Sequence, residues 1–322
     1  MVHLRIVLPA HRSQQVLDVL EATPSTCNLV LLAGAARKPP GDVILCDVAR
    51  EDASVVVHDL KELDVPRDGS ISLEQIDSQL SDAAERAERA APGAPSDAVV
   101  WEEVEARTSE SIELSGNFLL FMVLASLLAS VGIYTGSAIL IIGAMVVGPE
   151  FGPLAGFCVA AVERRRDVAL RSLAALAIGF PVAITAAFLF TLGCEATGLI
   201  DGDFSNEQRP LTQFISDPTT FSFIVAVFAG VAGVLSLTST KSGALVGVLI
   251  SVTTILAAAN VGIAAALGHW SEWRGAMAQL ALNVTAIVLA GVATLYIQRT
   301  LYNRRRRNHV TERGRPAAAQ RP

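Results

Sequence analysis

The residue whose chemistry stands out most is an acid, Glu150, in an otherwise apolar stretch. It lies in the segment Gly148-Pro149-Glu150-Phe151-Gly152-Pro153, near the middle of an apolar run from Ser137 to Val162. A carboxylate near the centre of a bilayer costs about 3 kcal/mol on insertion scales, so such a group is usually kept because it pairs, takes up a proton or binds something. Glu150 is therefore the leading candidate for a functional site.

The residues around Glu150 predict a break in the helix that carries it. Proline removes a backbone donor and clashes with the preceding turn, and glycine lets another backbone approach closely. A broken helix in a membrane is tolerated only where protein buries it or where it lines a wet cavity. Free carbonyls and a helix N-terminus at such a break are the usual material of binding sites in secondary transporters. We expect a substrate or ion site formed by Gly148, Pro149, Glu150, Gly152 and Pro153.

Two later apolar stretches carry polar residues at a matching depth. Residues 134–137 parallel residues 239–243, and at that offset the counterpart of the Glu150 segment falls at 253–258. A site near the middle of the membrane, between two related halves, would join Glu150 to these groups. Serine and threonine in membrane helices also bond to carbonyls of their own helix, which is the alternative for each of them. The candidate partners are Ser251, Thr253, Thr254, Asn260 and Asn283, with Gln279 as a further candidate.

The composition predicts an integral membrane protein with a soluble N-terminal part. Of the 322 residues 52% are hydrophobic, the mean hydropathy is +0.47, and the apolar residues gather after residue 113. Each apolar span is near the 20 residues that a crossing needs. The second is about 40 Å long as a helix against about 30 Å of hydrocarbon, which leaves length for a break. The six predicted spans are 114–132, 136–162, 168–190, 221–238, 243–267 and 275–298, which together form a membrane domain over 114–298.

The placement of arginine predicts the orientation of these spans. The N-terminus shows no signal-peptide pattern, so we expect it to stay in the cytosol. Arg164–Arg166, Lys241 and Arg304–Arg307 would then fall on the same, cytoplasmic side, as the positive-inside rule requires, and both chain ends would be cytoplasmic. Three spans that begin inside and three that begin outside are compatible with a 3+3 inverted repeat.

The first 75 residues predict an α+β domain. Alternating residues at 4–8, apolar runs at 29–33 and 43–48 and a short alternation at 70–73 indicate strands, and residues 11–22 and 50–63 have helical spacing. The order β-α-β-β-α-β is that of a ferredoxin-like domain. Residues 76–113 predict a helical linker. Ligand binding and a plain assembly role both remain open for the domain.

Charges, cysteines and histidines narrow the expected partners. Residues 1–113 carry 10 basic and 21 acidic side chains, whereas residues 299–322 carry eight basic and one acidic. We expect a disordered cytosolic tail over 299–322 that contacts anionic lipid, in preference to nucleic acid. The four cysteines lack CxxC spacing and the histidines of the N-terminal part are scattered, so we expect free thiols, no metal site and no cofactor.

The segments Thr135-Gly136-Ser137-Ala138-Ile139-Leu140-Ile141-Ile142-Gly143-Ala144-Met145-Val146-Val147-Gly148-Pro149 and Gly152-Pro153-Leu154-Ala155-Gly156 carry a family resemblance. They resemble the bacterial and archaeal proteins called the domain of unknown function 389 family. The resemblance extends loosely over residues 114–298 and implies the architecture above, in a bacterial plasma membrane. It implies no activity.

Three functions compete at this point. A transporter of a small solute or ion, coupled to protons or cations at Glu150, is the leading hypothesis. The alternatives are an oligomeric channel with Glu150 ringing an axis between chains, and a membrane-anchored sensor whose N-terminal domain binds a metabolite. Small residues along the second span suit tight packing, and we expect a homo-oligomer. An enzyme is not expected, because no base or nucleophile stands at motif spacing from Glu150.

Overall fold

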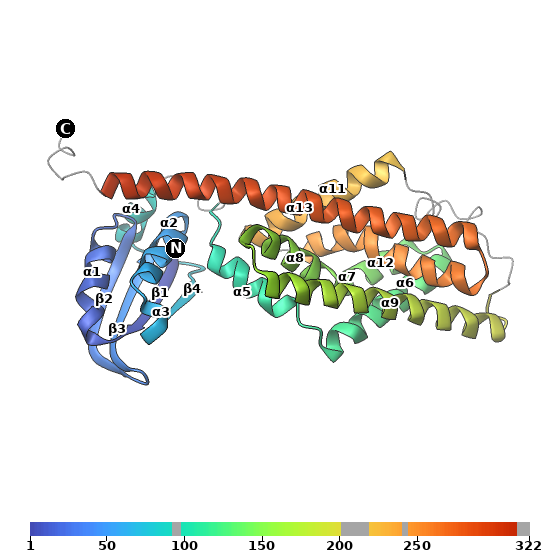
Figure 1. The fold of residues 1–322 in the computed structure, drawn as a ribbon, viewed down its shortest axis with the longest axis horizontal. Coiled ribbons are helices and arrows are strands. Elements are labelled where there is room, and N and C mark those ends of the chain that lie inside the picture. The colour runs from blue at the N-terminus through green and yellow to red at the C-terminus, as the bar shows by residue number, and fades with distance from the viewer. Residues whose placement is uncertain (92–97, 201–218, 240–243, 314–322) are drawn as a thin grey trace. The chain divides into compact units, whose positions relative to one another are not determined.

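A computed structural model describes residues 1–91, 98–200, 219–239 and 244–313, and the side chains of residues 107, 110, 111, 244–253 and 305–313 lie outside that description. The contacts divide the chain into two compact units. We call Met1–Val104 with Arg299–Pro322 the sheet unit and Glu105–Gln298 the helical unit (Figure 1).

Four antiparallel strands form the centre of the sheet unit. They are β1 Val2–Leu8, β2 Thr26–Arg37, β3 Pro40–Val48 and β4 Ser70–Gln75, in the order β2-β3-β1-β4. Helix α1 Ser13–Glu21 joins β1 to β2, and α2 Arg50–Glu62 lies between β3 and β4. The order β-α-β-β-α-β is the one that the periodicity of the sequence predicts, and it is the split βαβ connectivity.

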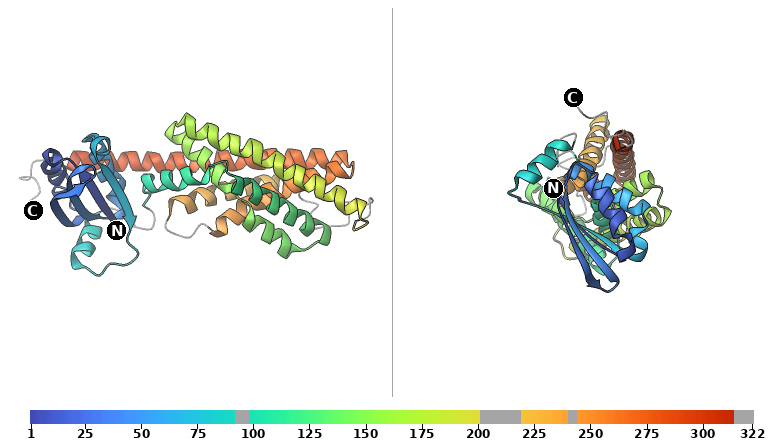
Figure 2. Two further views of the ribbon diagram at one scale, coloured as in Figure 1. Left: turned by 90° about the horizontal axis from the view of Figure 1, so that it is seen from below. Right: turned by 90° about the vertical axis from the view of Figure 1, so that its left-hand side faces the viewer.

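Strand alternation and helix amphipathicity build the core of this unit. In β1 the residues with no exposed surface alternate with partly exposed ones, so Leu4 and Ile6 face the helices while Arg5 faces outward. The helices pack against that face of the sheet (Figure 2, right). Val16 and Leu20 of α1 and Val56 and Leu60 of α2 are fully buried in this core.

The sheet unit continues past residue 75, where the sequence predicts a linker. Short elements η1 Ala10–Arg12 and α3 Val65–Asp68 complete the fold, and α4 Asp82–Ala90 follows β4. Val100 joins the hydrophobic core of the sheet, and the contacts assign residues up to Val104 to this unit. The linker region therefore contributes to packing as well as to connection.

The helical unit consists mainly of apolar helices. They are α6 Gly116–Thr135, α7 Ala138–Val147, α8 Phe151–Glu163, α9 Arg166–Ala196, α11 Thr220–Thr238, α12 Ala244–Ala266 and α13 Trp270–Arg313, preceded by α5 Trp101–Ser111. Side-chain caps begin several of them. The Ser115 hydroxyl accepts from the amide of Phe118, and Thr219 forms a capping box with Ser222.

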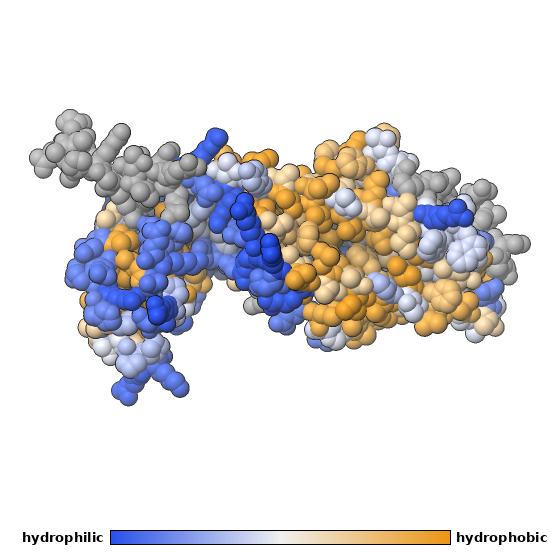
Figure 3. All heavy atoms as spheres, in the orientation of Figure 1, coloured by the Kyte–Doolittle hydropathy of each residue, from blue (hydrophilic) through white to orange (hydrophobic). Residues whose placement is uncertain are grey.

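The described helices give four to five candidate membrane spans. α6, α9, α11 and Trp270–Arg304 are each long and apolar enough, and the pair α7 and α8 makes a fifth if it is one broken span. Large apolar side chains face outward, with Leu170 71% and Phe221 79% exposed, which suits contact with lipid. Figure 3 shows hydrophobic residues over much of the visible face of this unit. The described helices thus support four to five of the six predicted spans, and the described apolar helix Thr254–Ala266 is shorter than a crossing.

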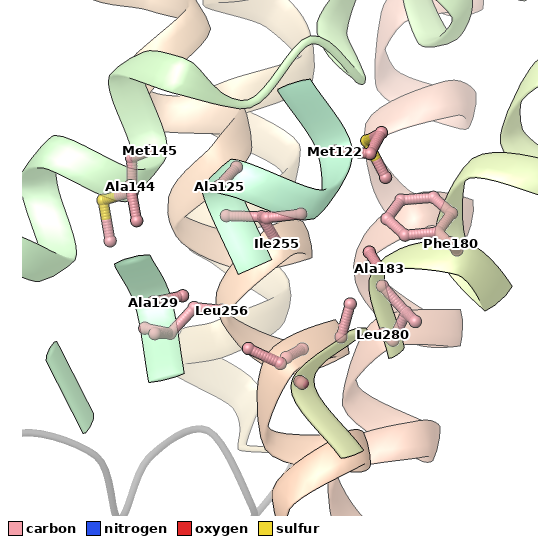
Figure 4. Packing of buried hydrophobic residues seen from close by; sticks show 14 of the residues in the cluster. Met122, Ala125, Ala129, Ala144, Met145, Phe180, Ala183, Ile255, Leu256 and Leu280 are labelled. Atoms are coloured by element: carbon pink, nitrogen blue, oxygen red, sulfur yellow. The ribbon is translucent and has the colours of Figure 1, made fainter. Parts of the chain in front are cut away.

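α12 is the central helix of this unit. Every described residue from Thr254 to Gly262 is buried. Ile255 and Leu256 pack with residues of α6, α7 and α9 (Figure 4). A Cβ on Gly262 would lie 2.5 Å from the carbonyl oxygen of Ile184, so α12 and α9 touch backbone to backbone there. This close approach explains why small residues are frequent in these helices.

The C-terminal region differs from the predicted disordered tail. α13 continues as a helix to Arg313, and residues 314–322 lie outside the described part of the chain. The guanidinium carbon of Arg299 lies 4.6 Å from the ring centroid of Trp101, and the Tyr302 ring meets the same indole edge to face. Arginine is a good helix former and these aromatic contacts hold the first turns past residue 298, so the apolar helix does not end where its apolar sequence ends.

Candidate functional site

Glu150 lies at the break between α7 and α8, where the two helices are bent by 49°. It is the N-cap residue of α8, its side chain has no exposed surface, and its carbonyl accepts from the amide of Leu154 at 3.2 Å. The backbone of Gly148 is extended, with φ −63° and ψ 121°, which ends α7. The predicted break is therefore present in the helix that carries the acid.

The two prolines act differently at this break. Pro149 has no amide hydrogen, so the carbonyl of Met145 lacks the donor that a continuing helix would supply four residues later. Pro153 occupies the first turn of α8, where an amide would find no partner within the helix in any case. One proline thus ends α7 and the other is compatible with the start of α8.

Glu150 is bonded to another helix. The Thr254 hydroxyl of α12 donates to Glu150 Oε1 at 2.9 Å, and both side chains have no exposed surface. The two residues stand 104 positions apart in the sequence. Thr254 is one of the predicted partners of Glu150, and it bonds to the acid across the helix interface.

The packing of α8 against α13 indicates which residue of α13 is level with Glu150. Leu154 shares a hydrophobic cluster with Ile287, and a Cβ on Gly291 would lie 2.9 Å from the Cys158 sulfur. Both pairs are separated by 133 positions, and the Cys158 sulfur also lies 3.7 Å from the carbonyl oxygen of Val288, so the two helices run parallel. This packing puts the turn of α13 at residues 280–283 at the height of Glu150, and Asn283 in that turn is 1% exposed.

Gln279 stands one helical turn before Asn283 and is bonded to it. Its Nε2 donates to Asn283 Oδ1 at 3.1 Å, and Gln279 is 4% exposed. Within the described part of the chain, Gln279 Oε1 is buried without a hydrogen-bond partner. The sequence names Gln279 only as a further candidate, although its spacing of four from Asn283 places both on one face of an apolar helix.

The other predicted partners are not brought together in the same way. Asn260 is buried, but it follows Thr254 by six residues, which on a helix is a rotation of about 240° and a rise of about 9 Å. It therefore lies on a different side of α12 from Thr254. The side chains of Ser251 and Thr253 lie outside the described residues.

No group of three or more His, Cys, Asp or Glu side chains that could hold a metal ion occurs among the described residues. The arrangement at Glu150 is instead a single carboxylate that accepts from the hydroxyl of Thr254. Such a set can accept a proton at the acid or donate oxygen ligands to a cation.

A second buried carboxylate, Asp47, lies in the sheet unit. It pairs with His3 Nδ1 at 2.7 Å and accepts from Asn28 Nδ2 at 2.7 Å and Gln79 Nε2 at 2.8 Å. Burial alone would raise the pKa of Asp47, but these hydrogen bonds outweigh it and the pKa is lowered. Burial, and secondarily the charge of Asp47, raises the pKa of the neighbouring Cys46 thiol to about 12.

Comparison with known proteins gives a family and one distant relative. Residues 145–289 match the family described as Domain of unknown function (DUF389). Over 196 residues the chain is 26% identical to an uncharacterised protein of Methanocaldococcus jannaschii, and the alignment covers 60% of this chain and 58% of that protein. No solved structure matches the chain. Residues 145–289, which include Glu150, Thr254 and Asn283, therefore match the DUF389 family, the family that residues 135–156 resemble.

Proposed function

We propose that this protein transports a small solute or ion across a membrane, through a site at the break between α7 and α8. The observation that carries the proposal is Glu150, a fully buried acid held at a helix break and bonded by Thr254 of another apolar helix. An ionisable group in a membrane helix is costly and is usually kept for a function. A broken helix beside it supplies the backbone groups that carriers use at their binding sites.

In this proposal the Glu150 carboxylate couples transport to a proton or a cation. It can take up and release a proton, or it can hold a cation, as the site opens to one side and then to the other. The break between α7 and α8 is the place where such a movement needs the least rearrangement, because Gly148 and Pro149 already interrupt the helical hydrogen bonds.

We propose six membrane crossings, which is more than the four to five that the described helices give. α12 has 23 residues, or about 35 Å as a helix, which is long enough for a sixth crossing. Six crossings as a 3+3 inverted repeat would put both chain ends on the cytoplasmic side of a bacterial plasma membrane. α12 is a helix without a break at the position that corresponds to the Glu150 segment, so the proposed halves would share their topology and differ at the break.

Purified protein in liposomes tests the proposal. Sodium, potassium and proton gradients are imposed on the liposomes, uptake of labelled solutes is measured, and ion flux is followed with internal dyes. We expect the wild type to support flux of at least one cargo, and Glu150→Gln to reduce that flux to the level of empty liposomes. Glu272→Gln is the matched control, because Glu272 lies in the first turn of α13, away from the break.

Equal flux through the wild type and Glu150→Gln would contradict the proposal. Absence of flux for every cargo and gradient would contradict it as well. Stepwise single-channel currents in planar bilayers would instead favour an oligomeric pore.

A further inference from the structure

Strand β2 carries a run of exposed apolar residues at one edge of the sheet (Figure 1). Val30, Leu31 and Leu32 expose 43%, 43% and 44% of their surface, and residues 33–35, which are Ala, Gly and Ala, are exposed as well. No charged residue occurs from Thr26 to Ala36. Exposed apolar runs of this length are unfavourable unless they serve binding.

The edge strand on the other side of the sheet, β4, differs from β2 in length and in polarity. β4 has six residues, against 12 in β2, and its exposed residues are Ser70, Glu74 and Gln75. Short edge strands and charged side chains are the features that prevent sheets from joining edge to edge. β2 has neither feature, and within the described residues β3 is the only strand paired with it.

The backbone of β2 defines a short regular segment. Residues 30–32 pair in regular register with residues 43–45 of β3, and the pairing is irregular on both sides of this stretch. Asn28, with φ 52°, and Gly34, with φ 64°, have left-handed backbones, and each stands three residues from Leu31. The part of β2 between them, residues 29–33, is therefore symmetrical about Leu31. We call it the edge segment.

A second copy of the same strand is complementary to the edge segment. In an antiparallel pair related by a twofold axis at Leu31, this residue lies opposite its own copy and Val30 lies opposite Leu32. Each opposed pair within the edge segment is then apolar, so no like charges meet. Contacts elsewhere on this unit are less favourable between copies, because residues 1–113 carry 10 basic and 21 acidic side chains.

A lipid surface would satisfy the edge segment less well than a strand. Val30 and Leu32 lie on one face of β2 and Leu31 lies on the other, so apolar surface is exposed on both faces. A bilayer would leave the amides and carbonyls of the open edge without hydrogen-bond partners. A second strand supplies those partners and covers apolar side chains on both faces.

We propose that two copies of this chain join through β2, as antiparallel strands centred on Leu31. The two sheets then form one continuous sheet of eight strands, four from each copy. This contact goes beyond the proposed transport function and does not depend on it.

Cysteine cross-linking of the full chain in liposomes tests the contact. Leu31→Cys is made in a chain whose four native cysteines are replaced by alanine, and a short bifunctional thiol reagent is added. Opposed side chains of antiparallel strands have Cβ atoms about 4.5–5.5 Å apart, so we expect most of the chain to become a cross-linked dimer.

Two control positions separate pairing from random collision. Leu80, in the same unit, is 101% exposed, so collisions should cross-link Leu80→Cys more readily than Leu31→Cys. Glu74→Cys places a thiol on the other edge strand. We expect little dimer from either control.

Charge exchange tests the register. In chains that carry Leu31→Cys, the pair Val30→Lys and Leu32→Lys sets like charges opposite each other, and the pair Val30→Glu and Leu32→Glu does the same. Each double variant should lower cross-linking about tenfold, and an equal mixture of the two should restore it, because opposite charges then face each other. Val30 and Leu32 are each more than 40% exposed, so both double variants should keep the melting temperature of the parent chain.

Several results would overturn the proposal. They are cross-linking at position 31 that does not exceed that at position 80, equal cross-linking in the like-charge variants, and a mixture that fails to restore it. In native membranes, cross-linking of Leu31→Cys to a different protein and not to its own copy would assign the edge to that protein. Quenching of a fluorophore at position 31 by brominated lipid, without dimer, would assign the edge to the membrane surface. Either of these assignments would also overturn the proposal.

Discussion

Asp47 and Glu150 are both buried carboxylates, one in each unit, and their surroundings differ. Asp47 bonds to His3, Asn28 and Gln79, three side chains from other segments of the same small unit. Glu150 lies at a helix break and accepts from Thr254 of a different apolar helix. A carboxylate with several fixed donors cross-links a fold, whereas one placed where the backbone is already interrupted can change its partners. Burial alone therefore does not distinguish a structural acid from a functional one.

The largest expected difference between the two acids concerns stability. Asp47→Ala removes the acceptor from three side chains and should destabilise the sheet unit by about 2 kcal/mol. Hydrogen exchange of the full chain, followed by mass spectrometry, should then be about 30-fold faster in β1 and β3. Glu150→Gln keeps a similar shape and should leave exchange in both units within about threefold of the wild type. Faster exchange throughout the helical unit in Glu150→Gln would make Glu150 a structural acid and remove the contrast.

A smaller effect is expected at the partner of Glu150. Thr254→Val keeps the shape of the side chain and removes one hydrogen bond to a carboxylate, a change of about 1.5 kcal/mol. In the liposome assay, flux should fall about tenfold, with Glu150 still in place. Asn260→Leu serves as comparison, because Asn260 lies on another side of α12. If Asn260→Leu impairs flux more than Thr254→Val does, the site is centred elsewhere on α12.

The smallest effect is a dependence of stability on pH that is confined to the sheet unit. The folded pKa of Asp47 is lowered, so its stabilising contribution is complete above the unfolded value of about 3.9 and is lost as pH falls through the folded pKa. Asp42 behaves in the same direction, because Ser13 and the amide of Gly34 hydrogen-bond its carboxylate and lower its pKa. Acid titration monitored by exchange in β1 and β3 should show this loss below about pH 4, and Asp47→Asn should reduce it. An unchanged titration in Asp47→Asn would assign the loss to other acids.

Local sequence patterns predicted much of the fold. The alternation in β1 and the helical spacing of α1 and α2 fixed the order of elements in the sheet unit, because each pattern reports a local period. Pro149 and Gly148 predicted the break for the same reason, since backbone chemistry acts within one turn. The end of α13 was not predicted, because its contacts with Trp101 join residues that are far apart in the sequence.

The candidate site was predicted only in part. Thr254 could be named because a polar residue in an apolar helix is conspicuous, but Asn260 gave the same signal and lies on a different face. Only the packing of α8 against α13 relates Asn283 and Gln279 to Glu150, and a register between distant helices leaves no trace in local sequence. The number of crossings is likewise a property of the assembled helices, and the described residues give four to five.

Access to position 150 from each side of the membrane tests the central claim most directly. Glu150→Cys and, as a control, Leu154→Cys are made in a chain whose four native cysteines are replaced by serine, and a membrane-impermeant thiol reagent is applied outside or trapped inside liposomes. Leu154 is one turn further along α8 and 1% exposed in an apolar cluster. A transport site at the break predicts that Cys at 150 reacts from both sides and Cys at 154 from neither. Reaction at position 150 from one side only, or from neither, would contradict the account.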